Sequence, residues 1–600
     1  MMNSSLETLA LYERRIFVMI MMQHHEKRVE VIVVGTGIGG LAAAKTYLEL
    51  APQTNLLLLE ERAALGGVWA DNCYEGLHTN NLYGSYEFAD FPLDQTKYNV
   101  KENTHVPAHA LRQYFSDFAD HFDIRRRIRF STRVHRVEKI DGGWKVKTEG
   151  VDDPGRSIVY TCDKLIISTG ISSRPNDVSI PGQGVFGRPV MNHSRLGTEG
   201  TSLAHDPRVK SVTVIGASKY GHDVVYMMAS QGKHVDWVIR KSGGGAVWMG
   251  TAWVPFGCWR AKREALTTTR FVTWFSPCIW GSFDGFGWLR RLLHGTRLGR
   301  WLVHLFWEKM SADVVEANGY RKEEPLKHLE PDESFFWTAR VGILTYPTDI
   351  YDFVRSGQVR VLRKDISHLS EGGQVHFSDG ESLQTDALVQ ITGWKLGSSI
   401  KYEPEGMDAS LGIPSSNLSP GERCLWKELD SAAESEILNQ FPYLRQQPAA
   451  KAPYQPGLSP FRLYRGIAPP GLTAQGDNSL AFMKMVHSPS NPIIAEIQAL
   501  WVYAYLNNKV SIARQTVFHD TALLSRYGKL RYPCGFSSWY PEIVFDSIPY
   551  VDMLLTDLGL RKWRKATWTR EVFEGYTVRD YQGINQEWAR AQKGVRLQSN

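Results

Sequence analysis

The stretch Val29 to Gly40, VEVIVVGTGIGG, constrains the fold of this chain more than any other. The apolar run Val31 to Val34 is typical of a central parallel strand that is covered on both faces. Gly35, Gly37 and Gly40 follow the pattern G-x-G-x-x-G, and the segment GLAAAKTYLEL predicts a helix. The three glycines make a tight turn, admit a pyrophosphate and let helix and strand pack closely. The stretch therefore predicts a dinucleotide-binding unit whose helix points its amino end at phosphate groups.

An acidic residue ends the next apolar run, LLLL, about 20 residues after the glycines. Glu60 is placed there to accept hydrogen bonds from a ribose hydroxyl. Its charge argues against a 2′-phosphate, because two anions would meet, so this site should hold FAD or NAD. The sequence GGVW follows, with Gly67 and Trp69, and a close glycine pair followed by Trp favours FAD. Trp69 could also be an ordinary core aromatic.

A second copy of this device lies in SVTVIGASKYGHDVVYMMASQG, which again predicts strand, turn and helix. Gly216, Ser218 and Gly221 occupy the three glycine positions, and serine is small enough to let a pyrophosphate approach. The next strand, HVDWVIRKS, ends in Arg240 and Lys241, where the first copy has its acid. A cation there would pair with a 2′-phosphate and select NADPH over NADH, whereas the alternative is a solvated basic strand end.

Two such repeats, roughly 180 residues apart, predict an α/β fold with two Rossmann-like dinucleotide-binding domains. The NADPH-binding domain is expected to be inserted in a discontinuous FAD-binding domain, and DALVQITGW is interpreted as a strand that returns to the first domain. The expected parts are a poorly ordered leader at 1–28, the FAD-binding domain at 29–204 and 385–510, the NADPH-binding domain at 205–384, and a carboxy-terminal extension at 511–600.

An aromatic and basic insertion at about 255–330 resembles neither repeat. Trp288, Leu292, Trp301 and Leu305, with the arginines between them, could form a substrate lid or a helix that lies on a membrane surface. An inserted helical hairpin packed on its own domain explains the pattern equally well. In the leader, IFVMIMM is too short to span a bilayer. We interpret it as an irregular leader, and a weak membrane anchor is the alternative interpretation.

Composition narrows the class of protein further. The net charge of +6 is small for 600 residues and shows no concentrated basic face, which argues against nucleic acid as a partner. Nineteen Trp suggest lipophilic or flat substrates. Six scattered cysteines lack metal-type or C-x-x-C spacing, which fits a reducing, cytoplasmic location, predicts no metal site and leaves no thiol pair for a disulfide reductase.

Together these motifs resemble the flavin-containing monooxygenase family, or class B flavoprotein monooxygenases. The matching segments are GTGIGG, the acid at Glu60, GGVW, HTNN around Asn80, GASKYG with Arg240, and ITGW. YPEIVFDSIPYVDMLLTDLGL and YTVRDYQGINQEW resemble the fungal subgroup associated with secondary-metabolite biosynthesis. The family pattern F-x-G-x-x-x-H is imperfect here, and it ends at His193.

The resemblance implies that NADPH reduces FAD, and that the reduced flavin and O2 form a flavin hydroperoxide that oxygenates a lipophilic small molecule. Asn80 matches the family's asparagine near the reactive face of the flavin, and an Asx-turn in the loop is the structural alternative. Gln498, in NPIIAEIQALW, could lie near the flavin. Rival functions are a Baeyer–Villiger oxygenase, which the missing Trp after His193 disfavours, and an NADPH oxidase or non-catalytic flavoprotein. Oligomeric state is left open.

Overall fold

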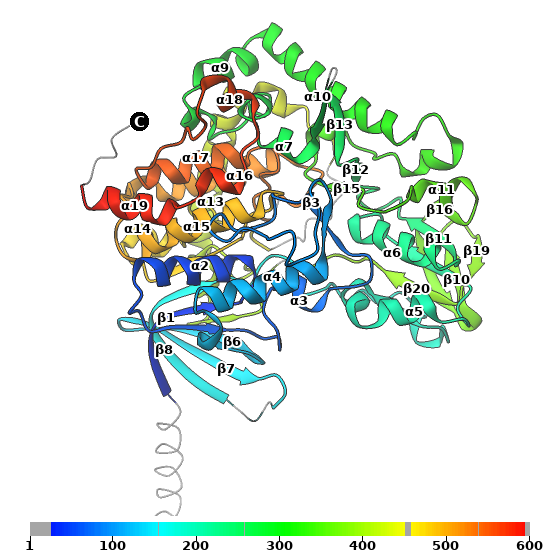
Figure 1. Ribbon diagram of the computed structural model, residues 1–600, viewed down its shortest axis with the longest axis horizontal. Helices are drawn as coiled ribbons and strands as arrows, with labels where there is room; N and C mark the ends of the chain where they lie inside the picture. Colours follow the sequence, from blue (N-terminus) through cyan, green and yellow to red (C-terminus); the bar gives the residue numbers. More distant parts are fainter. Residues whose placement is uncertain are drawn as a thin grey trace, which may run out of the picture.

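The computed structural model describes residues 26–153, 155, 157–256, 259–395, 397–449, 458–537 and 539–594. The expected leader lies outside these ranges except for residues 26–28, which begin a strand. The architecture is α/β, as predicted, with two main sheets that are flanked by helices (Figure 1). Each sheet contains one of the two glycine motifs at the end of a buried strand.

The first sheet is built around strand β1, which carries the first glycine motif at its carboxyl end. In spatial order its strands are β5 (Ile128–Arg129), β2 (Leu56–Leu59), β1 (Glu26–Val34), β8 (Ser157–Ile167), β7 (Gly143–Gly150), β6 (Thr132–Ile140) and β21 (Lys401–Glu403), with β22 (Leu480–Phe482) also paired to β8. β1, β2, β5, β8 and β22 run parallel, and β6 and β7 form an antiparallel hairpin. The carboxyl ends of β1, β8 and β22 therefore meet at one edge.

The second sheet is parallel throughout and is built around β10, which carries the second motif. Its order is β16 (Val359–Arg363), β11 (His234–Ile239), β10 (Ser211–Ile215), β20 (Ala387–Gln390) and β9 (Val190–Asn192). Val212, Val214 and Val389 are fully buried, as expected for strands covered on both faces.

This topology corrects two expectations from the sequence. The strand in DALVQITGW does not return to the first sheet, because β20 pairs with β10 from Val212–Ala387 to Ile215–Gln390. β9 lies within residues 29–204 and yet pairs with β20, so it also belongs to the second sheet. The crossings between the sheets therefore lie before β9 and after β20, and the chain rejoins the first sheet at β21.

Two long apolar helices pack together against the first sheet. α2 (Ile38–Leu50) follows the first motif, and it contacts α15 (Asn491–Leu506), of which every residue from Pro492 to Leu506 is buried. A third helix, α4 (Ala108–His121), is amphipathic, with Leu111, Phe115 and Phe118 on its buried face. α6 (Lys219–Ser230) follows the second motif. Shorter helices are α3 (Val68–Asp71), α5 (Thr201–His205), α11 (Ile350–Arg355), α12 (Met407–Leu411) and α14 (Pro470–Gln475).

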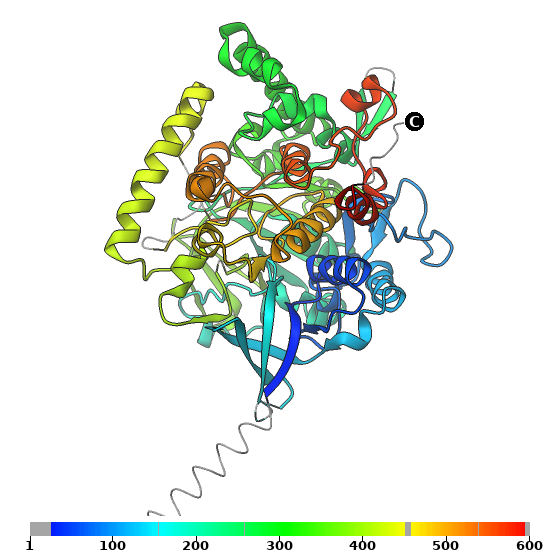
Figure 2. The ribbon, with the colours of Figure 1, turned by 90° about the vertical axis from the view of Figure 1, so that its left-hand side faces the viewer.

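A helix of 21 residues, α13 (Pro420–Gln440), follows α12 in the chain. Figure 2 shows it along one flank of the molecule. A capping box starts it: Ser419 accepts from the backbone N–H of Glu422, whose side chain accepts from Ser419 N, and Pro420 occupies the first turn. The local sequence SPGE carried this signal.

The insertion forms a helical hairpin that packs on the carboxy-terminal extension. Its helices are α7 (Arg263–Thr267), α8 (Arg270–Trp274), α9 (Gly287–Gly295) and α10 (Arg297–Ala317). The extension contributes α16 (Val517–Arg531), α17 (Ser547–Asp557), α18 (Trp568–Phe573) and α19 (Ile584–Gln592). Trp307 of α10 packs edge-on against Phe545, and Phe286 stacks on Trp563. α19 also contacts α2, so the extension joins the insertion to the first domain.

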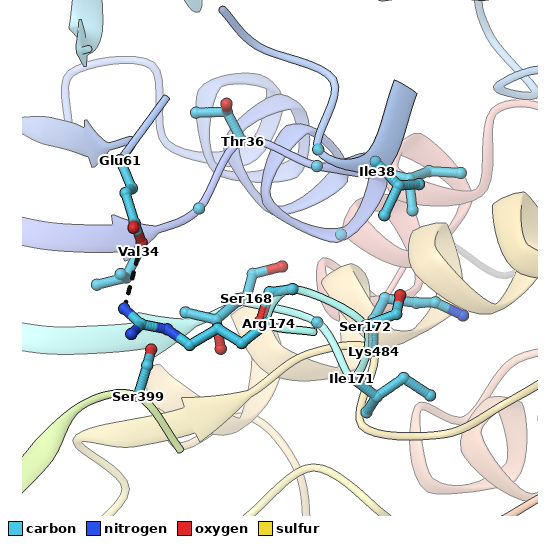
Figure 3. Close-up of a pocket in the computed structure, with 18 of the residues that line it drawn as sticks. Val34, Thr36, Ile38, Glu61, Ser168, Ile171, Ser172, Arg174, Ser399 and Lys484 are labelled. Atoms are coloured by element: carbon cyan, nitrogen blue, oxygen red, sulfur yellow. Dashed lines mark ion pairs between the residues drawn. The ribbon is translucent and has the colours of Figure 1, made fainter. Parts of the chain in front are cut away.

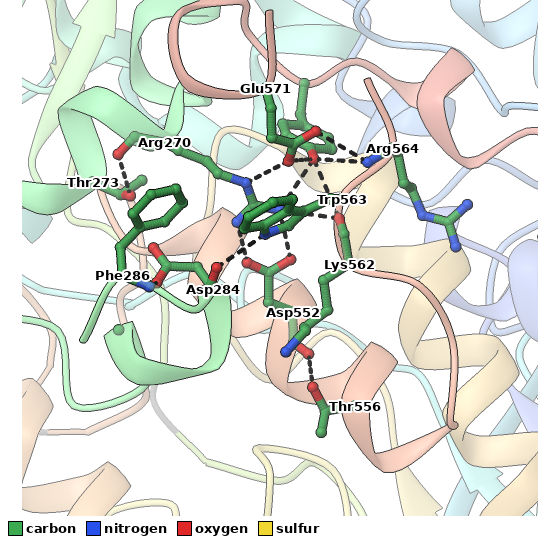
Figure 4. Close-up of polar contacts among 12 residues, drawn as sticks. Arg270, Thr273, Asp284, Phe286, Asp552, Thr556, Lys562, Trp563, Arg564 and Glu571 are labelled. Atoms are coloured by element: carbon green, nitrogen blue, oxygen red, sulfur yellow. Dashed lines mark hydrogen bonds and ion pairs between the residues drawn. The ribbon is translucent and has the colours of Figure 1, made fainter. Parts of the chain in front are cut away.

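A buried cluster of charges fastens this junction (Figure 4). The fully buried Arg270 of α8 forms ion pairs with Asp552 of α17 and Glu571 of α18, and its guanidinium also donates to Tyr576. Burial raises the pKa of Asp552 to about 6. Because a buried charge is tolerated only when it is paired, this cluster makes the positions of α8, α17 and α18 depend on one another.

Candidate active site

A cavity of about 420 Å³ lies at the edge where the carboxyl ends of β1, β8 and β22 meet. The first glycine motif forms one wall, and the segment 168–174 after β8 forms another (Figure 3). This is the position at which open α/β sheets bind nucleotides. Glu61 and Arg174, whose charged groups are 3.7 Å apart, lie on one side of the cavity, and Lys484 lies on the other.

The geometry of the first motif explains why its glycines are required. Gly35 has a φ of +100°, and a Cβ there would lie 2.5 Å from the carbonyl oxygen of Ser168. A Cβ on Gly40 would lie 1.9 Å from the carbonyl oxygen of Gly35. Gly37 and Gly67 face each other, with a Cβ on Gly67 only 3.0 Å from the Cα of Gly37. Exposed backbone at the start of α2 suits a pyrophosphate.

Glu60 lies at the end of β2, is buried and supports the glycine turn. Its Oε2 accepts from the backbone N–H of Thr36 at 2.8 Å and from the Thr36 hydroxyl at 2.7 Å, and its Oε1 accepts from Arg62 N at 3.0 Å. A carboxylate has about four acceptor positions, so capacity for a ribose hydroxyl remains. The acid therefore shapes the turn in addition to its predicted role.

Aromatic side chains line the part of the cavity beyond the glycines. Trp69 lines the wall, and its indole N–H donates to the hydroxyl of Tyr86 at 3.1 Å. Val486, Phe536 and Tyr540 complete this apolar lining. Trp69 is therefore part of the cavity wall, and this position differs from the alternative interpretation, in which it is an ordinary core residue.

Lys484 is a lining residue that the sequence analysis missed. It follows β22 with a φ of +59°, is buried, and donates from Nζ to Asn491 Oδ1 at 2.7 Å. Burial lowers the pKa of Lys484 to about 7. Gln498 lies behind it rather than in the wall: its Oε1 accepts from Lys484 N at 2.9 Å, and its Nε2 donates to Tyr550 at 2.8 Å. Gln498 therefore holds Lys484 in place from behind the residues that line the cavity.

The second motif repeats the geometry of the first. Gly216 has a φ of +110°, and a Cβ on Gly221 would lie 2.3 Å from the carbonyl oxygen of Gly216. Ser218 precedes α6 in an extended conformation, as Gly37 precedes α2, and its hydroxyl makes no capping hydrogen bond. The hydroxyl and the amino end of α6 are thus available to phosphate oxygens.

Arg240 is exposed at the carboxyl end of β11, where the first sheet has its acid. Its side chain lies within 3.5 Å of the position that a Cβ on Gly243 would occupy. Among the described residues, no carboxylate lies within 4 Å of its guanidinium, so the charge is available to an anionic ligand. Lys241 beside it is exposed as well.

Asn80 lies on β3 (His78–Leu82), with its side chain exposed and outside the lining of the first cavity. β3 contacts β15 (Val341–Ile343), which lies between β11 and β16 in the chain. Glu264 of the insertion accepts from the Asn81 side chain at 2.7 Å and from Leu82 N at 3.0 Å. The structure therefore places Asn80 at the junction of the domains and does not bring it together with the first glycine motif.

Two further contacts connect the motifs. Tyr74, near β3, donates to Asp223 of α6 at 2.6 Å. His193 is buried and packs edge-on against Trp394, which lines the first cavity, and against Tyr220 at the start of α6. Burial lowers the pKa of His193 to about 4, so the ring is neutral near pH 7. Its role here is apolar contact between the two sites.

Known proteins resemble this chain in sequence and in fold. The family model for pyridine nucleotide-disulphide oxidoreductases matches residues 29–243. The FAD-dependent monooxygenase rstn6 of Aspergillus nomiae is 31% identical over 581 residues, which covers 94% of this chain and 99% of the relative. The FAD-dependent monooxygenase resA of Aspergillus sclerotiorum is also 31% identical, over 95% of this chain and all of the relative.

This chain belongs to the flavin-containing monooxygenase family.

Solved structures agree on the fold of this monooxygenase. Cyclohexanone monooxygenase with bound cyclohexanone has a TM-score of 0.55 at 17% identity, over 95% of this chain and 99% of that one. A steroid monooxygenase bound to NADP has a TM-score of 0.55 at 18% identity, with the same coverage. Both confirm the predicted fold with two dinucleotide-binding domains.

The relatives named FAD-dependent monooxygenases agree with the prediction of FAD, and the match to the pyridine nucleotide family agrees with the prediction of a nicotinamide cofactor. The cavity at β1 fits FAD, because an acid, a glycine turn and an aromatic wall follow one another along it. The motif at β10 fits NADPH, because Arg240 replaces that acid. Within the described part of the chain, no helix combines the length and apolar character needed to cross a bilayer.

Proposed function

We propose that this monooxygenase uses NADPH and O2 to oxygenate a lipophilic small molecule, by hydroxylation, epoxidation or N-oxidation, and that the substrate is an intermediate of a secondary metabolite. The observation that carries the proposal is an apolar wall next to the first glycine motif, at which FAD is expected to bind. The wall consists of Trp69, Val486, Phe536 and Tyr540. Bound FAD supplies electron transfer from NADPH to O2 and transfer of one oxygen atom; the second oxygen leaves as water. The chain must orient the substrate and exclude water, and this wall suits both tasks.

The buried aromatic residues limit solvent at the flavin end of the cavity. Tyr86 is 8% exposed, Tyr540 7% and Val486 1%, whereas Phe536 is 41% exposed and can meet an incoming substrate. We infer that Asn80 contributes a hydrogen-bond donor to the reaction, from its place at the junction between β3 and β15 and outside the cavity lining. Support comes from Glu264, whose hydrogen bonds to Asn81 and Leu82 fix the strand on which Asn80 lies.

Oxygen-18 gas tests this proposal. The purified protein with FAD is incubated with NADPH, ¹⁸O2 and a metabolite extract of its host, and products are compared with a reaction that lacks NADPH. We expect one compound to gain a single ¹⁸O atom in a hydroxyl, epoxide or N-oxide. A lactone or ester formed from a ketone would assign Baeyer–Villiger chemistry instead. Stoichiometric labelled hydrogen peroxide without an oxygenated product would identify an NADPH oxidase.

We also propose that the protein resides in the cytoplasm and makes peripheral contact with an anionic membrane through the hairpin α9–α10. Trp288, Leu298 and Trp301 are more than half exposed, and Leu292, Leu302 and Leu305 are exposed on the same two helices. The opposite face of α10 is buried through Val303 and Trp307. Figure 2 shows the hairpin at the end of the molecule that is farthest from the start of β1.

Charge supports a lipid surface as the partner of this face. From residue 285 to 307 the sequence GFGWLRRLLHGTRLGRWLVHLFW contains four arginines and no acid. Arg290 is buried against Asp284, whereas Arg291 and Arg297 are exposed beside the apolar side chains. Exposed tryptophans with flanking arginines are typical of helices that lie in the headgroup region of an anionic bilayer.

Vesicle flotation tests the contact. We expect the protein to float with vesicles that contain phosphatidylserine, and less so at high salt or with phosphatidylcholine alone. The double variant Trp288→Ser, Trp301→Ser should stay in solution, whereas Leu425→Ser, at an exposed leucine of α13, should float like the wild type. Equal flotation of the hairpin variant would refute the assignment. If the wild type and Leu425→Ser are dimers and the hairpin variant is a monomer, the exposed face binds a second copy of this chain instead.

A further inference from the structure

Lys484 is an unusual cation for the wall of a nucleotide cavity. It is 9% exposed: its side chain lies against Gly39 of α2, where a Cβ would come within 2.9 Å of Lys484 Cγ, and Ser168 after β8 approaches the same point. Nζ donates to Asn491 Oδ1, a neutral acceptor. Among the described residues, no carboxylate lies within 4 Å of this amine. A buried ammonium without an anion is costly, so the site is incomplete without one.

The backbone of Lys484 is held in a conformation that keeps the amine at this place. A φ of +59° is rare for a residue with a side chain and persists only where the surroundings impose it. Gln498, which is fully buried, imposes it by accepting from Lys484 N, and Tyr550 in turn fixes Gln498. The arrangement is therefore built from α15 and α17, both outside the glycine motif.

The other basic side chains of the cavity each lie near a carboxylate. Arg62 approaches Glu60 at 3.9 Å, Arg174 approaches Glu61 at 3.7 Å, and His487 lies 3.3 Å from Glu542. The titratable groups that line the cavity with Lys484 are Glu60, Glu61, Arg62, Tyr86, Arg174, His487 and Tyr540. Lys484 alone, among these described cations, faces the cavity without a carboxylate, and it lies across from the Glu61–Arg174 pair (Figure 3).

We propose that Lys484 is the cationic binding residue for the negative charge of the cofactor at the flavin side of the cavity, and that FAD binding or reduction brings a proton onto its amine. Two parts of FAD carry such charge: the pyrophosphate, and the N1–C2 edge of the flavin ring once hydride transfer has made it anionic. Gly39 belongs to the first turn of α2, next to the pyrophosphate cradle, and Asn491 begins α15 at the aromatic end. Lys484 touches both.

The pH dependence follows from the amine. Burial holds the pKa of Lys484 at about 7 in the structure without ligand, and a neighbouring anion raises it. Below pH 7 the amine is already charged, so FAD affinity is constant. Above pH 7 binding must take up a proton, so affinity falls about tenfold per pH unit until the raised pKa is reached. If Lys484 pairs with the reduced flavin ring, the midpoint potential of the bound FAD depends on pH, and the affinity for oxidised FAD does not.

Two measurements on full-length protein distinguish these partners. FAD is titrated into the deflavinated chain between pH 6.5 and 9, with proton uptake measured by calorimetry in two buffers, and the midpoint potential of the holoprotein is measured over the same range. In Lys484→Met, a pyrophosphate partner predicts about 10- to 100-fold weaker binding of oxidised FAD at pH 6.5 and no proton uptake. A ring partner predicts unchanged binding of oxidised FAD and a more negative midpoint potential.

Arg174→Met is the matched control, because it removes a cavity cation that is already paired and is charged at every pH tested. Its proton uptake on binding and the slope of its potential should equal those of the wild type. Lys484→Arg should restore affinity without the pH dependence. The proposal is refuted if Lys484→Met binds oxidised FAD and sets the midpoint potential as the wild type does, with the same proton uptake.

Discussion

Substitution of one glycine in each motif should separate the two cofactor sites. In Gly40→Ala the new Cβ would lie 1.9 Å from Gly35 O, about 1.5 Å short of an ordinary contact of 3.4 Å. Neither atom belongs to a flexible side chain, so α2 must move away from the cradle. Such overpacking costs about 1–3 kcal/mol. If this cost falls on FAD binding, the affinity for FAD decreases about 5- to 150-fold.

Gly221→Ala makes the same change at the second site, where the Cβ would lie 2.3 Å from Gly216 O. It should keep FAD and bind NADPH more weakly, so that anaerobic bleaching of the flavin by NADPH needs a higher concentration. Gly421→Ala, in the first turn of α13 with nothing within 4 Å, is the control for both. Circular dichroism checks folding. Full FAD affinity in Gly40→Ala, or equal loss of both cofactors in each variant, would refute the two-site argument.

Three further predictions concern single side chains. Arg240→Ala should weaken the binding of NADPH about tenfold and leave the binding of NADH unchanged, because an exposed charge-assisted hydrogen bond to the 2′-phosphate is lost. Lys241→Ala should have a smaller effect. Equal losses of affinity for both nucleotides would show that Arg240 does not bind the 2′-phosphate. Asn80→Asp should retain FAD but lower coupled oxygenation by about 10²–10³ and divert NADPH to hydrogen peroxide, because a preorganised donor becomes an acceptor; unchanged coupling would deny the residue this role. Arg270→Met should destabilise the protein by about 3–5 kcal/mol, because Asp552 and Glu571 stay buried without their cation. The measurement is the thermal midpoint of unfolding, which should fall. Arg570→Met, at an exposed pair with Glu574, is the control and should change the midpoint little.

The features that the sequence predicted correctly are those encoded within about 30 residues. Each glycine motif specifies its own strand, turn and helix, and Glu60 and Arg240 are found by counting from it. The partner of β20 was predicted wrongly, because an apolar strand such as ALVQ fits the centre of either sheet. Its place is decided by β10 and β9, which lie more than 170 residues earlier in the chain.

Lys484 shows why part of the site could not be read from the sequence. In the segment LAFMKMVH a lysine is ordinarily a solvated residue after a strand, and no local pattern predicts its burial. It becomes a cavity residue because Gly39, Ser168 and Gln498 reach it from three distant segments. Gln498 was expected near the flavin, and the structure shows that its side chain holds the backbone of Lys484.

We expect the chain to hold FAD at the glycine turn after β1 and NADPH at the glycine turn after β10, with hydride transfer from NADPH to FAD. An anaerobic titration with NADPH, followed by the flavin absorbance of the purified protein, tests it directly. We predict one FAD per chain and complete bleaching by one equivalent of NADPH, with recovery of the yellow colour on admission of O2. A protein that stays colourless after reconstitution with FAD, or a bound flavin that NADPH does not bleach, would contradict the claim.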